Sequence, residues 1–240
     1  MNLTNLTSTA LIIYFSFLTG CDLSFQSSIY TRDLSDIIES DGKNVTEIPT
    51  QILIPALDKK KKTQTKILKM MKGVVNDPVF KGWKEGDFED FAIIETKCKI
   101  NLVENYEDEN AKLPLGELLS FYVTKSKEFA DKKGNKHHSL FLKLNQDSFS
   151  NLQEKIENEY LQEIDFSDVS ISFEVVNDLR KDFSFILPND CHVDSNGYLA
   201  VTEDVIRAEP RNNFTVEMTN VFSSYLKQNG KCRILLFNDL

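Results

Sequence analysis

The pattern of apolar and polar positions predicts more strands than helices. Alternating apolar residues, the period expected of strands, recur in residues 22–30, 45–57, 88–102, 118–123, 138–144, 169–176, 182–187, 197–201, 214–218 and 232–237. Apolar residues three and four apart, the period expected of helices, recur in residues 32–40, 58–76, 150–161 and 221–228. Because the strands come in blocks, the expected class is α+β, with mostly antiparallel sheets and three or four helices.

Proline and turn residues predict how some of these strands pair. Pro49 and Pro55 lack an amide hydrogen, so the strand over residues 45–57 is expected at a sheet edge. Asn177 and Asp178 favour a turn, so the strands on either side of them are expected to form a hairpin.

Two helix ends carry recognisable capping residues. Ser150 and Gln153 have the spacing of a capping box, which predicts a helix start at Ser150. Asn229 and Gly230 predict the end of the helix over residues 221–228, since glycine readily adopts positive φ.

One change in composition suggests a division of the chain. Residues 104–112 (ENYEDENAK) are short, polar and acidic. We therefore expect a signal peptide over residues 1–20, an N-terminal α+β sub-domain over 21–103 and a C-terminal α+β sub-domain over 113–240.

An apolar segment near the N-terminus predicts export and lipidation. Residues 11–21 (LIIYFSFLTGC) are too few to cross a hydrocarbon core about 30 Å thick, but they suit the apolar region of a secretory signal. Leu18, Thr19, Gly20 and Cys21 resemble the lipobox of bacterial lipoproteins, which implies a lipid on the Cys21 thiol and cleavage before it. The alternative is a plain secretory signal with a chance cysteine, since no Lys or Arg precedes Cys21.

The residue after the lipobox bears on location. Asp22 directly follows Cys21, an arrangement that resembles lipoproteins of enteric bacteria that stay in the inner membrane. The resemblance implies an inner-membrane anchor with the body facing the periplasm. A polar linker residue without a sorting role is the alternative.

Composition narrows the classes of partner. The chain has 41% hydrophobic and 27% charged residues with 9 Gly and 6 Pro, so a folded body is expected rather than a disordered tether. Its formal net charge is −9, which argues against a nucleic-acid partner, because such proteins present a basic surface to phosphates.

The cysteines allow at most one disulfide once Cys21 is lipidated. Cys98, Cys191 and Cys232 then remain, an odd number. We expect any bridge to join Cys191 and Cys232, because both lie in the C-terminal block. No cysteine or histidine spacing matches a zinc or haem motif, so no metal or cofactor is expected.

Candidate catalytic and metal-binding motifs are weak. The sequence lacks the common hydrolase, zinc-protease, dinucleotide and P-loop signatures, so no enzyme is expected. Adjacent His137 and His138 are expected at a solvated strand end. Residues 192–203 (HVDSNGYLAVTE) fit part of a calcium loop, but His192 replaces its first carboxylate, so a hairpin turn is the favoured interpretation.

A lysine-rich segment contrasts with the acidic chain. Lysines run through residues 59–62 and recur at Lys66, Lys69 and Lys72. Two interpretations stay open, a solvated helix face and a surface that contacts anionic lipid head groups.

The order of these pieces resembles a known family. The lipobox, an early short helix, a strand ending at Ile54 and Pro55, and a Lys-rich helix precede residues 166–185 (FSDVSISFEVVNDLRKDFSF) and a terminal block, 214–237. This arrangement is similar to uncharacterised lipoproteins encoded in tailed phages and prophages of enteric and related bacteria. The resemblance implies a phage or prophage origin and no particular activity.

The sequence therefore predicts a lipid-anchored, non-enzymatic protein that binds an envelope partner, with superinfection exclusion as its purpose. A structural or assembly lipoprotein of the envelope and a periplasmic enzyme are the alternatives.

Overall fold

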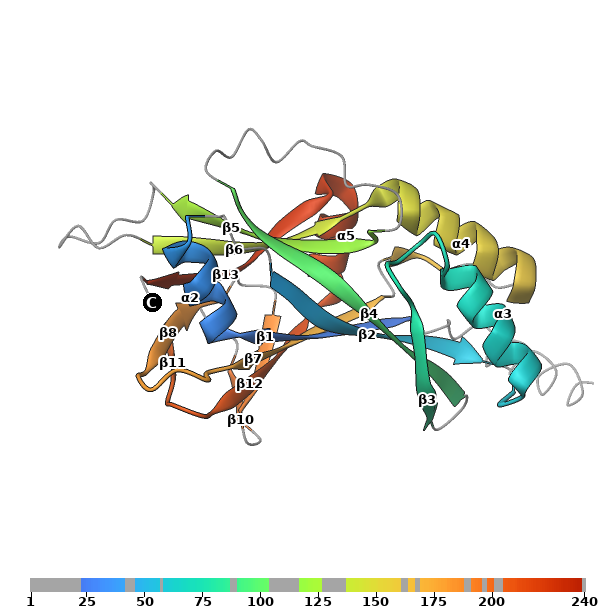
Figure 1. Ribbon diagram of the computed structural model, residues 1–240, viewed down its shortest axis with the longest axis horizontal. Coiled ribbons are helices and arrows are strands. Elements are labelled where there is room, and N and C mark those ends of the chain that lie inside the picture. Colours follow the sequence, from blue (N-terminus) through green and yellow to red (C-terminus); the bar gives the residue numbers. More distant parts are fainter. Residues whose placement is uncertain are drawn as a thin grey trace, which may run out of the picture.

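The computed structural model describes residues 23–41, 46–56, 58–86, 90–103, 117–126, 137–160, 164–166, 169–187, 191–195, 198–200 and 205–238. These residues contain thirteen strands and four helices (Figure 1). The strands are β1 (Ser24–Tyr30), β2 (Thr46–Ala56), β3 (Val79–Glu85), β4 (Asp90–Val103), β5 (Leu119–Ser126), β6 (His137–Leu144), β7 (Ser170–Val176), β8 (Phe183–Ile186), β9 (Cys191–Ser195), β10 (Tyr198–Ala200), β11 (Val205–Ala208), β12 (Asn213–Met218) and β13 (Lys231–Asn238). The helices are α2 (Thr31–Glu39), α3 (Lys61–Met71), α4 (Gln146–Tyr160) and α5 (Asn220–Asn229).

The described strands form one sheet in the order β10-β9-β12-β7-β1-β2-β4-β5-β6-β13-β8-β11. β4 is long enough to pair with β3 along its first half and with β5 along its last residues. β1 pairs with β7 in parallel, and β4 pairs with β5 in parallel. The first described strand of the chain therefore lies beside a strand from its C-terminal third.

The expected α+β fold of two small sub-domains is wrong. The domain is mostly β, and its sheet is nearly closed. β1 and β2 belong to the expected N-terminal sub-domain, yet β1 lies between β2 and β7. The local apolar pattern could not reveal this, because period-two alternation identifies a strand without identifying its neighbour.

The sheet curls so that its interior is a single core. Phe121 of β5 and Phe173 of β7 stand four strands apart in the sheet, yet their rings meet edge to face at 5.9 Å. Phe185 of β8 and Phe214 of β12 likewise meet at 6.0 Å, although they lie near opposite ends of the strand order. All four rings are buried. Such aromatic contacts across the interior hold the curled shape.

The expected edge position of the proline-containing strand is also wrong. β2 is paired on both sides, with β1 and with β4. Its register with β1 covers Thr50 to Leu53, so Pro49 and Pro55 lie just outside that ladder. A proline beyond the end of a ladder costs no hydrogen bond there, so neither proline interrupts the pairing of β2 with β1.

The expected hairpin around Asn177 does not form. β7 pairs with β1 and β12, whereas β8 pairs with β11 and β13. The Asn177 side chain is fully buried, and its amide nitrogen donates to the carbonyl oxygens of Lys181 (2.9 Å) and Ala208 (2.8 Å). Asn177 therefore fixes a corner at which the chain passes from one end of the strand order to the other.

Helix α4 begins earlier than its predicted capping box. The Asn145 side-chain oxygen accepts a hydrogen bond from the backbone N–H of Ser148 at 3.0 Å, which is an N-cap contact. Gln153 instead donates from its side chain to the carbonyl oxygen of Ile164. The capping-box prediction is therefore wrong, because another polar residue lies one turn upstream.

The end of α5 is confirmed. Gly230 has φ 70°, the left-handed conformation that glycine adopts without a Cβ clash, and its N–H donates to the Leu226 carbonyl. Among the described residues, no helix is long and apolar enough to cross a bilayer.

Candidate functional site

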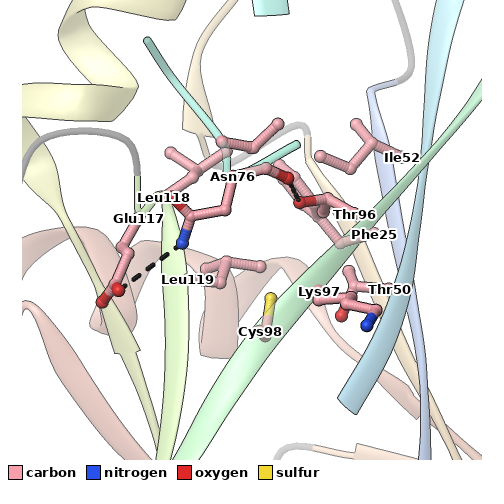
Figure 2. Close-up of a pocket in the computed structure, with 11 residues that line it drawn as sticks. Phe25, Thr50, Ile52, Asn76, Thr96, Lys97, Cys98, Glu117, Leu118 and Leu119 are labelled. Carbon is pink, nitrogen blue, oxygen red and sulfur yellow. Dashed lines mark hydrogen bonds between the residues drawn. The ribbon is translucent and has the colours of Figure 1, made fainter. Parts of the chain in front are cut away.

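Three separate segments enclose a small recess in the described part of the chain. They are the turn that follows α3, the middle of β4 with its neighbour β2, and the start of β5. The recess measures about 240 Å³, including its open mouth. Figure 2 shows Asn76 between Glu117 on one side and Thr96 on the other.

Polar side chains link these segments to one another. The Thr96 hydroxyl donates to the Asn76 carbonyl at 2.5 Å, and the Asn76 amide nitrogen lies 3.5 Å from the Glu117 carboxylate. Lys99 donates to the same carboxylate at 2.6 Å. The Glu117 side chain is only 9% exposed, and its hydrogen bonds with Lys99 and Asn76 offset the free-energy cost of burying its charge.

A buried thiol lines the floor of the recess. Cys98 is 5% exposed, and Figure 2 shows its sulfur pointing into the space. Burial raises the pKa of the Cys98 thiol to about 11; the Glu117 charge acts in the same direction and the Thr50 hydroxyl opposes it. At neutral pH the thiol is protonated, and a protonated thiol is a poor nucleophile.

The arrangement of this recess suits a structural joint. Its carboxylate, ammonium, amide and Thr96 hydroxyl are already paired within the chain. The Thr50 hydroxyl is hydrogen-bonded to that of Ser27 at 2.8 Å. These bonds tie the turn after α3 to β4 and β5, so they fix the position of α3 against the sheet.

None of the recess residues was predicted from the sequence as part of a site. Cys98 was expected in mid-strand, which is where it lies, but Asn76, Thr96 and Glu117 carried no motif. They come from segments far apart in the chain and meet because β4 pairs with β5. No local signal in the sequence could have joined them.

The predicted lipidation and sorting residues lie outside the described residues. These are Leu18, Thr19, Gly20, Cys21 and Asp22. The description begins at Leu23, the second residue after Cys21. Lipidation and sorting therefore stay predictions.

The predicted disulfide also stays a prediction. Cys191 is the first residue of β9, where its backbone lies opposite Met218, but its side chain is outside the description. Cys232 lies on β13 opposite Leu142 and is half-buried.

The histidine expectations have mixed outcomes. His138 is 1% exposed and stacks on Phe237 with ring centroids 5.8 Å apart, so the solvated strand end predicted there is wrong. His192 lies on β9, which pairs with β10 as a hairpin would; the intervening Asn196 and Gly197 are outside the description. The described residues contain no group of three or more metal-ligating side chains.

The lysine-rich segment is shorter as a helix than predicted, and its first lysines are paired. Lys59 contacts Glu85 at 2.9 Å and Asp90 at 3.0 Å, which ties the approach to α3 to β3 and β4. Lys60 contacts Asp58 at 2.7 Å. Lys66 pairs with Glu159, so Lys61, Lys62, Lys69 and Lys72 carry the segment's net positive charge.

The geometry defines a mostly β domain with a nearly closed sheet, a buried polar joint and a basic helix at one end. The chain belongs to the family described as Domain of unknown function (DUF7424), which matches residues 24–239. The expectation of an uncharacterised family is thereby confirmed. Comparisons with curated proteins and with solved structures gave no match.

Proposed function

We propose that the chain is a lipid-anchored envelope protein of phage or prophage origin that acts by binding an envelope partner, without catalysis. The observation that carries this proposal is the apolar segment ending in Leu18, Thr19, Gly20 and Cys21. Superinfection exclusion is the proposed purpose. It is supported by the resemblance to phage and prophage lipoproteins.

The start of the body is suited to a short tether. Leu23 is fully buried, and its carbonyl accepts a hydrogen bond from the Ser170 N–H at 2.9 Å. The chain then enters β1, which is paired on both sides. Two extended residues span about 7 Å, so a lipid on Cys21 would hold this end of the sheet close to the bilayer.

A binding role without catalysis is supported by the chemistry of the recess. Its thiol is protonated at neutral pH, because burial raises the Cys98 pKa to about 11. Its carboxylate, Glu117, is already hydrogen-bonded to Lys99. A nucleophile or general base would need the opposite conditions, a lowered thiol pKa or a carboxylate open to substrate.

Fatty-acid labelling tests the anchor. Cells grown with labelled palmitate should incorporate the label into the wild-type protein but not into a Cys21→Ser variant, which should stay unprocessed. Cys98→Ser is the matched control and should keep the label, because that thiol is buried. Equal labelling of wild type and Cys21→Ser would refute the lipoprotein proposal.

Membrane fractionation tests the proposed location. Wild-type protein should band with inner-membrane markers, and Asp22→Ser should move toward the outer membrane. Wild-type protein that already bands with outer-membrane markers would contradict the sorting role of Asp22.

Cross-linking in intact cells tests the proposed mode of action. A discrete envelope protein should be captured by the wild-type chain, and its loss should remove the exclusion of a second phage. If exclusion persists without any captured partner, binding is not the mechanism.

A further inference from the structure

Helix α3 has one apolar face and one basic face. Its apolar face is buried and consists of Ile67, Met70 and Met71. At about 100° of rotation per residue, four exposed lysines fall within an arc of about 100° on the opposite side. These four, the basic face, are Lys61, Lys62 and Lys69 of the helix and Lys72, the residue that follows it.

The charge of the basic face is not cancelled by neighbouring side chains. Its four lysines form no ion pair with any of the described residues. Two acidic groups on neighbouring elements are paired with other lysines. Glu159 pairs with Lys66, and Glu95 on β4 pairs with Lys81 on β3 at 2.7 Å.

The helix that carries this face is held rigidly. Lys155 of α4 donates to the carbonyl oxygens of Met70 (3.1 Å), in the last turn of α3, and of Lys72 (3.3 Å), the residue that follows the helix. A cation at this position also complements the negative end of the helix dipole. The backbone that carries the basic face is therefore held in place against α4, while the lysine side chains project from it.

The basic face lies at the end of the sheet where the body begins. Ser24, the first residue of β1, is opposite Leu53 of β2, and β2 then leads directly toward α3. Figure 1 shows the start of β1, the end of β2 and α3 at the same end of the molecule. Ser24 lies one strand spacing, about 5 Å, from Leu53, and the eight residue steps from Leu53 to Lys61 span at most about 27 Å, so Ser24 and the start of α3 are no more than roughly 30 Å apart.

We propose that the basic face of α3 docks on the anionic lipid surface of the membrane that holds the anchor. That the lipid anchor turns this face toward the membrane rests on the proposed function. The affinity of the face for anionic lipid does not depend on the anchor. The chain as a whole is acidic, with a net charge of −9, and would be repelled from such a surface. At physiological salt the Debye length is about 8 Å, so a bilayer in contact with α3 responds to the local lysines more than to distant carboxylates.

Vesicle binding of the full chain carrying Cys21→Ser tests the face without the lipid. The probes are vesicles of phosphatidylcholine alone and vesicles of equal parts phosphatidylcholine and phosphatidylglycerol. Binding should be much stronger to the anionic vesicles and should weaken with added salt. Because each lysine near such a surface contributes about fivefold in partitioning, Lys62→Glu with Lys69→Glu should reduce binding by about twentyfold or more.

A matched charge reversal at the opposite end of the sheet is the control. Arg180 and Lys181 are exposed and follow β7, whose end lies beside the end of β1. Arg180→Glu with Lys181→Glu changes the net charge by the same amount, but binding to anionic vesicles should stay within about twofold of the parent. Circular dichroism of both variants checks that the fold is kept.

Three results would overturn the proposal. One is equal binding of the parent to neutral and anionic vesicles, and another is an equal loss of binding in the two double variants. The third is binding to a soluble polyanion such as heparin but not to the vesicles, which would show that the face serves an acidic macromolecule instead. If palmitate labelling fails, only the proposed lipid anchor is refuted, because vesicle binding is measured on the Cys21→Ser chain, which carries no lipid.

Discussion

At the scale of single residues, Cys98 shows how burial controls the protonation state of a side chain. Its thiol sits in a polar recess, but burial dominates and raises its pKa to about 11 from an ordinary value of 9.0. Because the pKa is raised in the folded state, the thiol's contribution to stability is complete below about pH 9. That contribution is lost as the pH rises through about 11.

We predict that native Cys98 resists alkylation. At pH 8 a thiol with a pKa two units higher has about a hundredfold less thiolate, and burial slows access further. Iodoacetamide labelling followed by peptide mass spectrometry should modify Cys98 in the urea-unfolded chain at least about a hundredfold faster than in the native chain. Comparable rates in the two states would show that the thiol is exposed and reactive.

At the scale of elements, sequence patterns located helices and strands better than their ends or partners. α2 and α5 lie close to their predicted ranges, because each combines apolar spacing with clear boundary residues such as Gly230. The start of α4 was misplaced because Ser150 and Gln153 also fit a cap. The choice between two polar candidates is made by the tertiary structure, which places Asn145 beside the first turn.

We predict that Asn145, rather than Ser150, stabilises the start of α4. Asn145→Ala removes the side-chain oxygen that accepts from the Ser148 N–H and should lower the free energy of unfolding by about 1 kcal/mol. Ser150→Ala changes an exposed position and should stay within about 0.5 kcal/mol of the parent. Urea denaturation measures the free energy of unfolding of both variants. A larger loss of that free energy in Ser150→Ala than in Asn145→Ala would support the capping box at Ser150.

At the scale of the whole molecule, strand pairing was out of reach of the sequence. The parallel partners β1 and β7 are separated by most of the chain, and no sequence feature of either strand identifies the other as its partner. The acidic stretch over residues 104–112 suggested a boundary, whereas the strands on its two sides, β4 and β5, pair with each other. The recess forms because β4 and β5 pair, so the residues that line it could not be predicted from the sequence.

A single core and a continuous sheet predict cooperative unfolding. Trp83, the chain's one tryptophan, lies on β3, within residues 21–103, the range that the sequence predicts as an N-terminal sub-domain. Its fluorescence and the far-ultraviolet circular dichroism of the whole chain should give the same urea midpoint. Coincidence of two such probes is a standard test of two-state behaviour.

A distant substitution makes this test sharper. Asn177 lies at the corner between β7 and β8, and Asn177→Ala leaves the carbonyls of Lys181 and Ala208 without its amide, which should cost about 2 to 3 kcal/mol. Because the sheet couples both halves of the chain, the Trp83 transition should shift by the same free energy as the circular dichroism. Asn229→Ala, which removes an exposed amide that bonds the Tyr225 carbonyl, is the control and should shift both probes by less than about 1 kcal/mol. A Trp83 transition that stays fixed while the circular dichroism moves would mean that the N-terminal strands unfold as an independent unit.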